Sequence, residues 1–233
     1  MKSLFLLMIL MIAAVPGAWA QASCASNGQG TPVSVMERFI SADCDICWST
    51  PTDMAGTEGA LTIDWIVPSA SADNAPLSAA ADRDALTRLE SLGLPKPSPT
   101  RATVVNTAVV SNPLVKLRVA HGLALGGYIG ASIELTVEAT PAGNWQPWLL
   151  LLETIPAGME GSPVTRNLVR NVLIPSWQIA GAQPSPAQRE FREMRPMGIP
   201  YGTTPERLRV LGWVQDEKGQ LLSAAQSVCA PVD

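Results

Sequence analysis

Alternating apolar and polar positions recur along much of the chain. Residues 33–39 alternate with one exception, Glu37, which falls among the apolar positions. Residues 61–67 place every second apolar side chain on one face and end at Pro68. A period of two residues is typical of a strand with one buried face. Both segments are therefore predicted to be strands.

A helical period follows the second predicted strand. Apolar residues recur at a spacing of four within residues 77–91, and Gly93 ends the pattern. This spacing predicts one face of a helix. Residues 103–105, after three closely spaced prolines, predict a further short strand.

From about residue 114 the pattern predicts strands without intervening helices. The continuously apolar stretch at 148–152 predicts a central strand, over residues 148–155, that is buried on both faces. Gly219 closes a four-residue hairpin turn. Residues 161–204 are predicted to be a long connection with many prolines, in which residues 164–173 fit either a strand or a helix. The further predicted strands are 115–119, 132–138, 207–215 and 220–227.

The first predicted strand runs directly into a pair of cysteines, Cys44 and Cys47, that are separated by two residues. A dithiol with this spacing after a strand is typical of a redox pair. If a helix begins at the motif, its free N–H groups favour a thiolate at Cys44. Asp43 and Asp45 flank Cys44 and oppose that thiolate, which predicts a pair on the reducing side of the known range.

The other two cysteines, Cys24 and Cys229, lie near the two ends of the mature chain. An even number of cysteines in an exported protein favours disulfides, so Cys24–Cys229 and Cys44–Cys47 are the expected pairs. A Cys₄ zinc site is the alternative, but only one pair has the spacing of zinc ligands. We therefore expect no metal and no cofactor.

Residues 1–20 have the charged start, apolar core and small-residue cleavage site of a secretory signal. We expect a periplasmic or secreted protein with no membrane span in the mature chain. The formal net charge is −4 and the chain has no cluster of basic residues, which argues against nucleic acid as a partner. Protein thiols and disulfides are the expected partners, and the oligomeric state is left open.

Residues 37–47, Glu-Arg-Phe-Ile-Ser-Ala-Asp-Cys-Asp-Ile-Cys, resemble the opening of a family of secreted bacterial proteins of unknown function. The end of the chain, residues 208–225, is similar to the last hairpin of that family. The resemblance implies an α+β protein, with a thioredoxin-like βαβ domain over residues 31–112 and an antiparallel, β-sandwich-like half over residues 113–229. It also implies a cis-proline beside the dithiol, for which Pro99 is the candidate.

Three functions remain open from the sequence. The first is a thiol–disulfide oxidoreductase in which Cys44 attacks and Cys47 resolves. The second is a non-catalytic periplasmic binding or assembly module in which Cys44–Cys47 is a structural disulfide. The third is a hydrolase that uses Asp64, His121 or Glu153, and it is disfavoured because these residues are scattered over separate predicted strands.

Overall fold

The computed structural model describes residues 24–51, 58–110, 112–138, 143–177, 179 and 189–229. These residues form two β-sheets, two α-helices and three short 3₁₀ helices. None of the helices in this part of the chain has the length and hydropathy needed to cross a membrane. Residues 1–20, the predicted secretory signal, lie outside the described residues.

One sheet has seven strands, and the other has five. The strands of the first are β2 (Ser34–Ser41), β3 (Ala60–Val67), β4 (Thr103–Ala108), β7 (Gln146–Ile155), β8 (Arg166–Leu173), β10 (Leu208–Gln215) and β11 (Leu221–Gln226). Those of the second are β1 (Cys24–Ala25), β5 (Val115–Leu125), β6 (Tyr128–Val137), β9 (Arg189–Gly198) and β12 (Val228–Cys229). The helices are α1 (Asp45–Ser49), α2 (Asp84–Ser91), η1 (Ala72–Asn74), η2 (Ser78–Ala80) and η3 (Pro205–Arg207).

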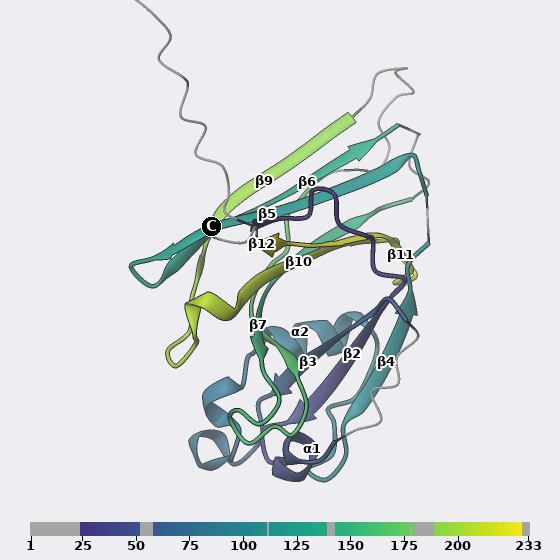
Figure 1. Cartoon of the computed structure of the whole chain (residues 1–233). Helices are drawn as coiled ribbons and strands as arrows, with labels where there is room; N and C mark the ends of the chain where they lie inside the picture. The colour runs from purple at the N-terminus through teal and green to yellow at the C-terminus, as the bar shows by residue number, and fades with distance from the viewer. Residues whose placement is uncertain are drawn as a thin grey trace, which may run out of the picture.

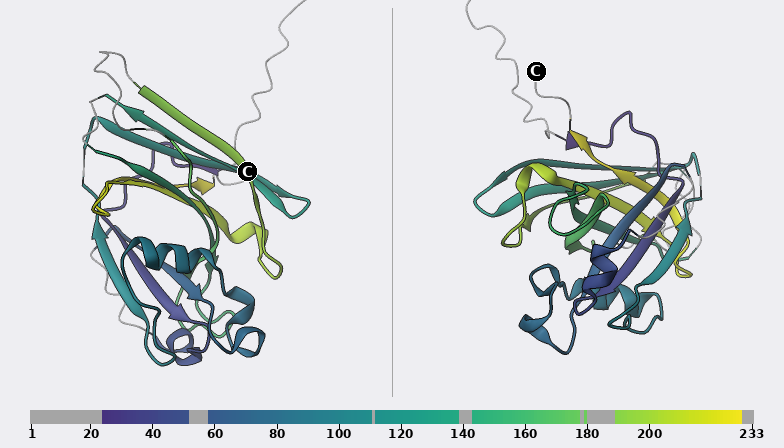
Figure 2. Two further views of the ribbon diagram at one scale, coloured as in Figure 1. Left: turned by 180° about the vertical axis from the view of Figure 1, so that it is seen from behind. Right: turned by 60° about the horizontal axis from the view of Figure 1, so that its bottom comes forward.

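The two sheets lie against each other at one end of the molecule. The strand order is β11-β10-β7-β8-β3-β2-β4 in the seven-stranded sheet and β12-β1-β5-β6-β9 in the five-stranded sheet. Figure 1 shows the five-stranded sheet crossing over β10 and β11, with α1 and α2 toward the opposite end. The turned views in Figure 2 show the same separation between the five-stranded sheet and the helices.

The predicted division into a thioredoxin-like domain over residues 31–112 and a sandwich-like half over residues 113–229 is wrong. The protein is mostly β, and β3 pairs in parallel with β8 where Asp64 lies opposite Leu168, so one sheet contains strands from both predicted parts. β2 and β3 are parallel neighbours, but the only α-helix described between them, α1, has five residues. Periodicity along a strand shows which residues share a face, but it does not show which strand edges pair.

The seven-stranded sheet is covered on both faces. On one face α2 packs its buried Ala85 and Leu89 against a cluster that includes Trp65, Trp148 and Trp213. The opposite face is divided between two coverings. The five-stranded sheet packs on apolar residues of β7 and β10, and the α1 segment packs on β2, β3 and β8.

Glu37, the exception in the first alternating segment, is buried on the α2 face. The guanidinium of Arg88 on α2 donates to both of its carboxylate oxygens, and the indole N–H of Trp65 donates to one of them. Arg88 also donates to Gln215 on β10 over 2.8 Å. A buried charge is tolerated where it is paired and hydrogen-bonded, so Glu37 fits an apolar face because α2 carries its partner.

The sheets approach each other closely at Gly212 on β10. A Cβ atom placed there would lie 2.5 Å from Cγ1 of Val119 on β5 and 3.2 Å from Cδ1 of Ile133 on β6. Both side chains are fully buried. A side chain at this position would therefore push the two sheets apart, and glycine is required for the approach.

Most of the strands predicted from periodicity are present, usually with longer bounds. Residues 164–173, left undecided between strand and helix, contain β8. The predicted helix over 77–91 is divided into η2 and α2. The strand β9 lies within residues 161–204, for which the sequence predicts a long connection and not a strand.

Candidate functional site

Both predicted disulfides are confirmed. Cys44 bonds to Cys47 across three positions, and Cys24 bonds to Cys229 across 205 positions. No free cysteine occurs in the part of the chain that the structure describes. The Cys44–Cys47 disulfide lies at the end of β2, where α1 begins.

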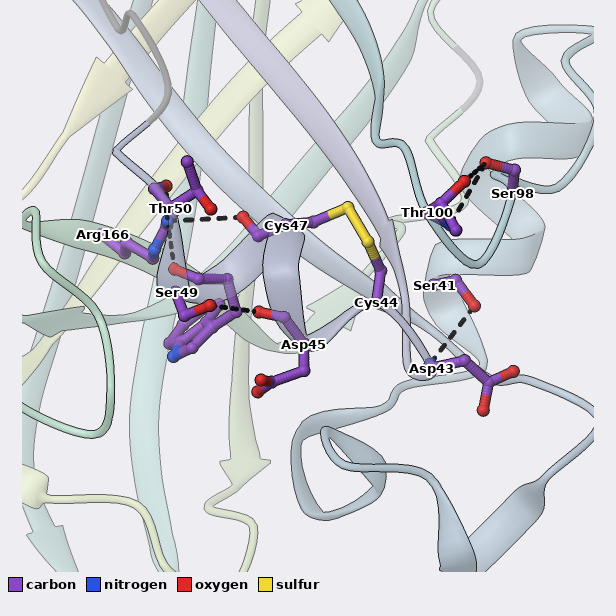
Figure 3. Close-up of a disulfide and its surroundings, with 11 residues drawn as sticks. Ser41, Asp43, Cys44, Asp45, Cys47, Ser49, Thr50, Ser98, Thr100 and Arg166 are labelled. Atoms are coloured by element: carbon purple, nitrogen blue, oxygen red, sulfur yellow. Dashed lines mark hydrogen bonds between the residues drawn. A yellow bond between two sulfur atoms is a disulfide. The ribbon is translucent and has the colours of Figure 1, made fainter.

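Local hydrogen bonds shape the turn that carries Cys44 and Cys47. The Cys44 N–H donates to the Ser41 carbonyl over 2.8 Å, and the Cys47 N–H donates to the Cys44 carbonyl over 3.1 Å. Cys44 is the N-cap residue of α1 and has no exposed surface, whereas Cys47 is half-buried. Figure 3 shows the carboxylates of Asp43 and Asp45 directed away from the sulfur–sulfur bond. Their charges therefore act on the sulfurs less than their sequence positions indicate.

A shallow depression lies beside Cys47. Its volume is about 280 Å³, and Cys47 lines it while Cys44 does not. The exposed side chain of Ile46 and two arginines, Arg38 and Arg101, also line it. Its remaining lining residues are Thr50, Thr100 and Ala102.

Arg166 on β8 contacts the segment that carries Cys44 and Cys47. The sequence did not predict this contact. Its guanidinium is fully buried and lies 4.8 Å from the ring centroid of Trp48. It donates to the carbonyls of Trp48, Thr50 and Cys47 over 2.6, 3.3 and 3.5 Å. Carbonyls at the C-terminal end of a helix have no partner within the helix, so Arg166 satisfies those of α1. The five-residue helix is thereby fixed to the sheet.

Asp64 on β3 lies between two buried arginines beneath the motif. One of its carboxylate oxygens accepts a hydrogen bond from Nε of Arg38 over 2.6 Å, and the other lies 3.6 Å from Nη1 of Arg166. Burial raises the pKa of Asp64 from 3.8 to about 6, and the charge and hydrogen bond of Arg38 oppose this increase. Asp64 thus links Arg166, which holds the Cys47 segment, to Arg38, which lines the depression.

The residues considered for a hydrolase are not brought together. Asp64 and Glu153 lie in the seven-stranded sheet, and His121 lies in the five-stranded sheet. Glu153 is fully buried, where it accepts hydrogen bonds from Arg170 and from the Thr204 N–H. Burial lowers the pKa of His121, the hydrogen bond to Gly122 opposes this decrease, and the charge of Arg209 lowers the pKa further.

Pro99 lies in the loop between α2 and β4, near the motif. The described residues contain no cis peptide bond, so the predicted cis-proline at Pro99 is wrong. The neighbouring loop residues Ser98 and Thr100 hydrogen-bond within their own turn (Figure 3). This loop forms one wall of the depression through Thr100 and Arg101.

Comparison with known proteins identifies no family. No protein-family model matches the chain, and no curated protein matches it in sequence. Among solved structures, the chain is similar to HBP35 of Porphyromonas gingivalis, with 13% identity and a TM-score of 0.48 over 85% of this chain and 76% of that chain. A likeness at this level supports no argument about function, and the family resemblance of residues 37–47 stays a prediction.

Proposed function

We propose that the protein exchanges disulfides with protein thiols through Cys44 and Cys47, and that a substrate attacks the sulfur of Cys47. The observation that supports this proposal is the difference in access between the two sulfurs. Cys47 lines an open depression, whereas Cys44 has no exposed surface. This assignment reverses the roles expected from the order of the cysteines in the sequence.

The exchange begins when a substrate thiolate attacks Sγ of Cys47. The bond between Cys44 and Cys47 breaks, and Cys44 leaves with the electron pair and takes up a proton. A second substrate thiolate then attacks the substrate sulfur of the mixed disulfide, and Cys47 leaves as a thiolate. Two electrons have then passed to the protein, which holds a thiol at Cys44 and a thiolate at Cys47, and the substrate holds a disulfide. The reverse steps transfer electrons from the protein to a substrate disulfide.

The surroundings of Cys47 favour negative charge. Arg38 and Arg101 line the depression beside it, and the guanidinium of Arg166 contacts its carbonyl. Positive charge close to a cysteine stabilises the thiolate, which is the leaving group and nucleophile of the exchange. Arg101 is the exposed arginine of this lining, and it favours an acidic peptide as the substrate. Two disulfides also fit an oxidising compartment, which supports the proposed periplasmic or secreted location.

Single-cysteine variants test the assignment. In a background with Cys24→Ser and Cys229→Ser, the Cys44→Ser variant should accumulate a mixed disulfide when it is mixed with a peptide dimer linked by one disulfide. The Cys47 thiolate attacks that disulfide, one peptide leaves as a thiolate, and no resolving thiol is left in the protein. The Cys47→Ser variant should accumulate much less, because Cys44 is buried. Mass spectrometry of the folded proteins identifies the linked cysteine. Equal trapping by both variants, or trapping only at Cys44, contradicts the proposal.

A binding or assembly module with a structural Cys44–Cys47 disulfide is the second candidate function. A depression of about 750 Å³ at the β10–β11 hairpin favours it, because Trp145 and Trp177 supply aromatic surface there. Equilibration of the folded protein with glutathione separates the two candidates. A Cys44–Cys47 bond that neither glutathione nor reduced thioredoxin breaks supports the structural role and contradicts the exchange function.

A further inference from the structure

Three residues from neighbouring strands meet at the edge of the five-stranded sheet. Cys24 on β1 lies directly opposite Cys229 on β12 and directly opposite His121 on β5. Side chains of directly opposed residues point to the same face of a sheet. The two sulfur atoms and a ring nitrogen of His121 all lie within 4.8 Å of one another.

The ring of His121 is held in one tautomer. Its Nδ1 lies 2.9 Å from the carbonyl oxygen of Gly122, which accepts but cannot donate a hydrogen bond. Nδ1 therefore carries the proton, and Nε2 presents a lone pair. A metal-binding histidine is commonly oriented in this way, by a hydrogen bond from its other nitrogen to a backbone carbonyl.

Nε2 of His121 has no hydrogen-bond partner among the described residues, although the residue is only 4% exposed. An unpaired buried polar atom is rare in folded proteins and costs free energy. A ligand that accepts the lone pair of Nε2 would remove this cost.

A depression gives access to this cluster from solvent. Its volume is about 390 Å³, and all three residues of the cluster line it, together with Leu208 and Arg209. A metal ion can therefore reach the sulfurs and the imidazole, and a water molecule can complete its coordination.

We propose that Cys24, His121 and Cys229 bind Zn²⁺ when the disulfide between the two cysteines is reduced. Two thiolates and one neutral imidazole are a zinc ligand set that leaves the fourth tetrahedral position open. The ion replaces the disulfide as the link between β1 and β12. The site is separate from the Cys44–Cys47 pair and does not depend on the proposed exchange function.

The conversion needs a reductant, which is a dithiol. Its two thiols reduce the Cys24–Cys229 bond with two electrons and two protons, and the dithiol becomes a disulfide. Zn²⁺ then displaces the protons of Cys24 and Cys229, and two protons are released to solvent. The zinc ion undergoes no redox change. When a disulfide compound takes two electrons from the two thiolates and two protons from solvent, it becomes a dithiol, the Cys24–Cys229 bond forms again and the ion is released.

The test uses the full chain with Cys44→Ser and Cys47→Ser, so that one pair of thiols is present. The protein is reduced with a dithiol, separated from it without air, and titrated with Zn²⁺ against a chromophoric chelator. We expect one zinc ion per reduced chain and none per oxidised chain. Adding His121→Ala should weaken zinc binding by about 100-fold. Loss of a residue that only orients a ligand costs about 10- to 100-fold, and His121 is itself a ligand. Absence of stoichiometric binding by the reduced protein overturns the proposal, as does an unchanged affinity in the His121 variant.

Co²⁺ provides a readout that does not depend on the folding of the His121 variant. In the reduced Cys44→Ser/Cys47→Ser protein, Co²⁺ should give thiolate charge-transfer absorption and the strong visible bands of a four-coordinate ion. Adding Cys229→Ser removes one sulfur ligand and should reduce the charge-transfer intensity by about half, in proportion to the thiolates. A six-coordinate spectrum without thiolate bands in the protein that retains Cys24 and Cys229 overturns the proposal.

Discussion

Asp64 should make the stability of the protein fall as the pH rises from 4 to 7. Burial raises the pKa of this carboxyl group from 3.8 to about 6 in the folded protein. The folded state therefore binds the proton more tightly than the unfolded state does. The stabilisation from that proton is fully present below about pH 4 and is lost as the pH rises through about 6.

The size of the effect follows from the two pKa values of Asp64. The difference between 3.8 and about 6 is roughly 2 units, and each unit corresponds to about 1.4 kcal/mol. The full contribution is about 3 kcal/mol, and about 2 kcal/mol of it should be lost between pH 4 and pH 7, because the unfolded carboxyl group is already more than half ionised at pH 4. The carboxyl group is fully buried, so solvent screening does not reduce this figure.

Urea denaturation of the wild type and the Asp64→Asn variant at pH 4 and pH 7 measures this contribution. The substitution itself has a cost, because Arg38 and Arg166 lose a charged partner. That cost is the same at both pH values. It therefore cancels when the difference in unfolding free energy between the two proteins at pH 4 is subtracted from the difference at pH 7. Titration of Asp82, Asp84 and other shared groups cancels as well.

The wild type should lose about 2 kcal/mol relative to Asp64→Asn on going from pH 4 to pH 7. A change in the opposite direction would mean that the two arginines outweigh burial and hold the pKa of Asp64 below 3.8. That result would refute the reasoning.

The remaining predictions concern stability and support of the motif. Gly212→Ala should destabilise the protein by about 1–3 kcal/mol in urea denaturation, because the new Cβ would overlap Val119. The control is Gly130→Ala, whose new Cβ would have no atom within 4 Å and should cause no comparable loss of stability. Cys229→Ser should cost about 2–5 kcal/mol, and an unchanged melting temperature would contradict a role for the disulfide in stability. Arg166→Met should increase hydrogen exchange at the amides of α1, because three carbonyls lose their donor, and unchanged exchange would argue against the proposed support.

Most of the strands could be predicted from one regular face, as in residues 61–67 of β3, and β7 could be predicted from its continuously apolar run. Both disulfides could be predicted because the number and placement of cysteines leave few pairings. The pairing of β3 with β8 could not be predicted, since the two strands lie about a hundred residues apart and nothing in the alternation of either strand specifies its neighbour.

The charged groups beneath the motif were missed for a related reason. Arg38 and Asp64 are 26 residues apart, and Arg166 and Trp48 are 118 apart. In the sequence Arg38 and Asp64 lie on the polar faces of two alternating strands, and Arg166 lies in residues 164–173, which fit either a strand or a helix. They are buried because both faces of the seven-stranded sheet are covered. A buried charge costs free energy unless it is paired, so these residues form ion pairs. One signal in the sequence could have indicated such a pair. It is a charged residue in a strand that carries apolar residues on both of its faces, because such a strand is buried on both faces.

The two disulfides differ in what they can contribute to stability. Closing a loop of 205 positions between Cys24 and Cys229 corresponds to about 5 kcal/mol in the chain-entropy model. The Cys44–Cys47 bond closes a loop with a sequence separation of 3, for which the same model gives about 2 kcal/mol. Arg166 and the hydrogen bonds of the turn already hold this segment in place. The Cys44–Cys47 bond therefore contributes less to stability than the Cys24–Cys229 bond does, and the proposed exchange through the accessible sulfur of Cys47 would give it a second role.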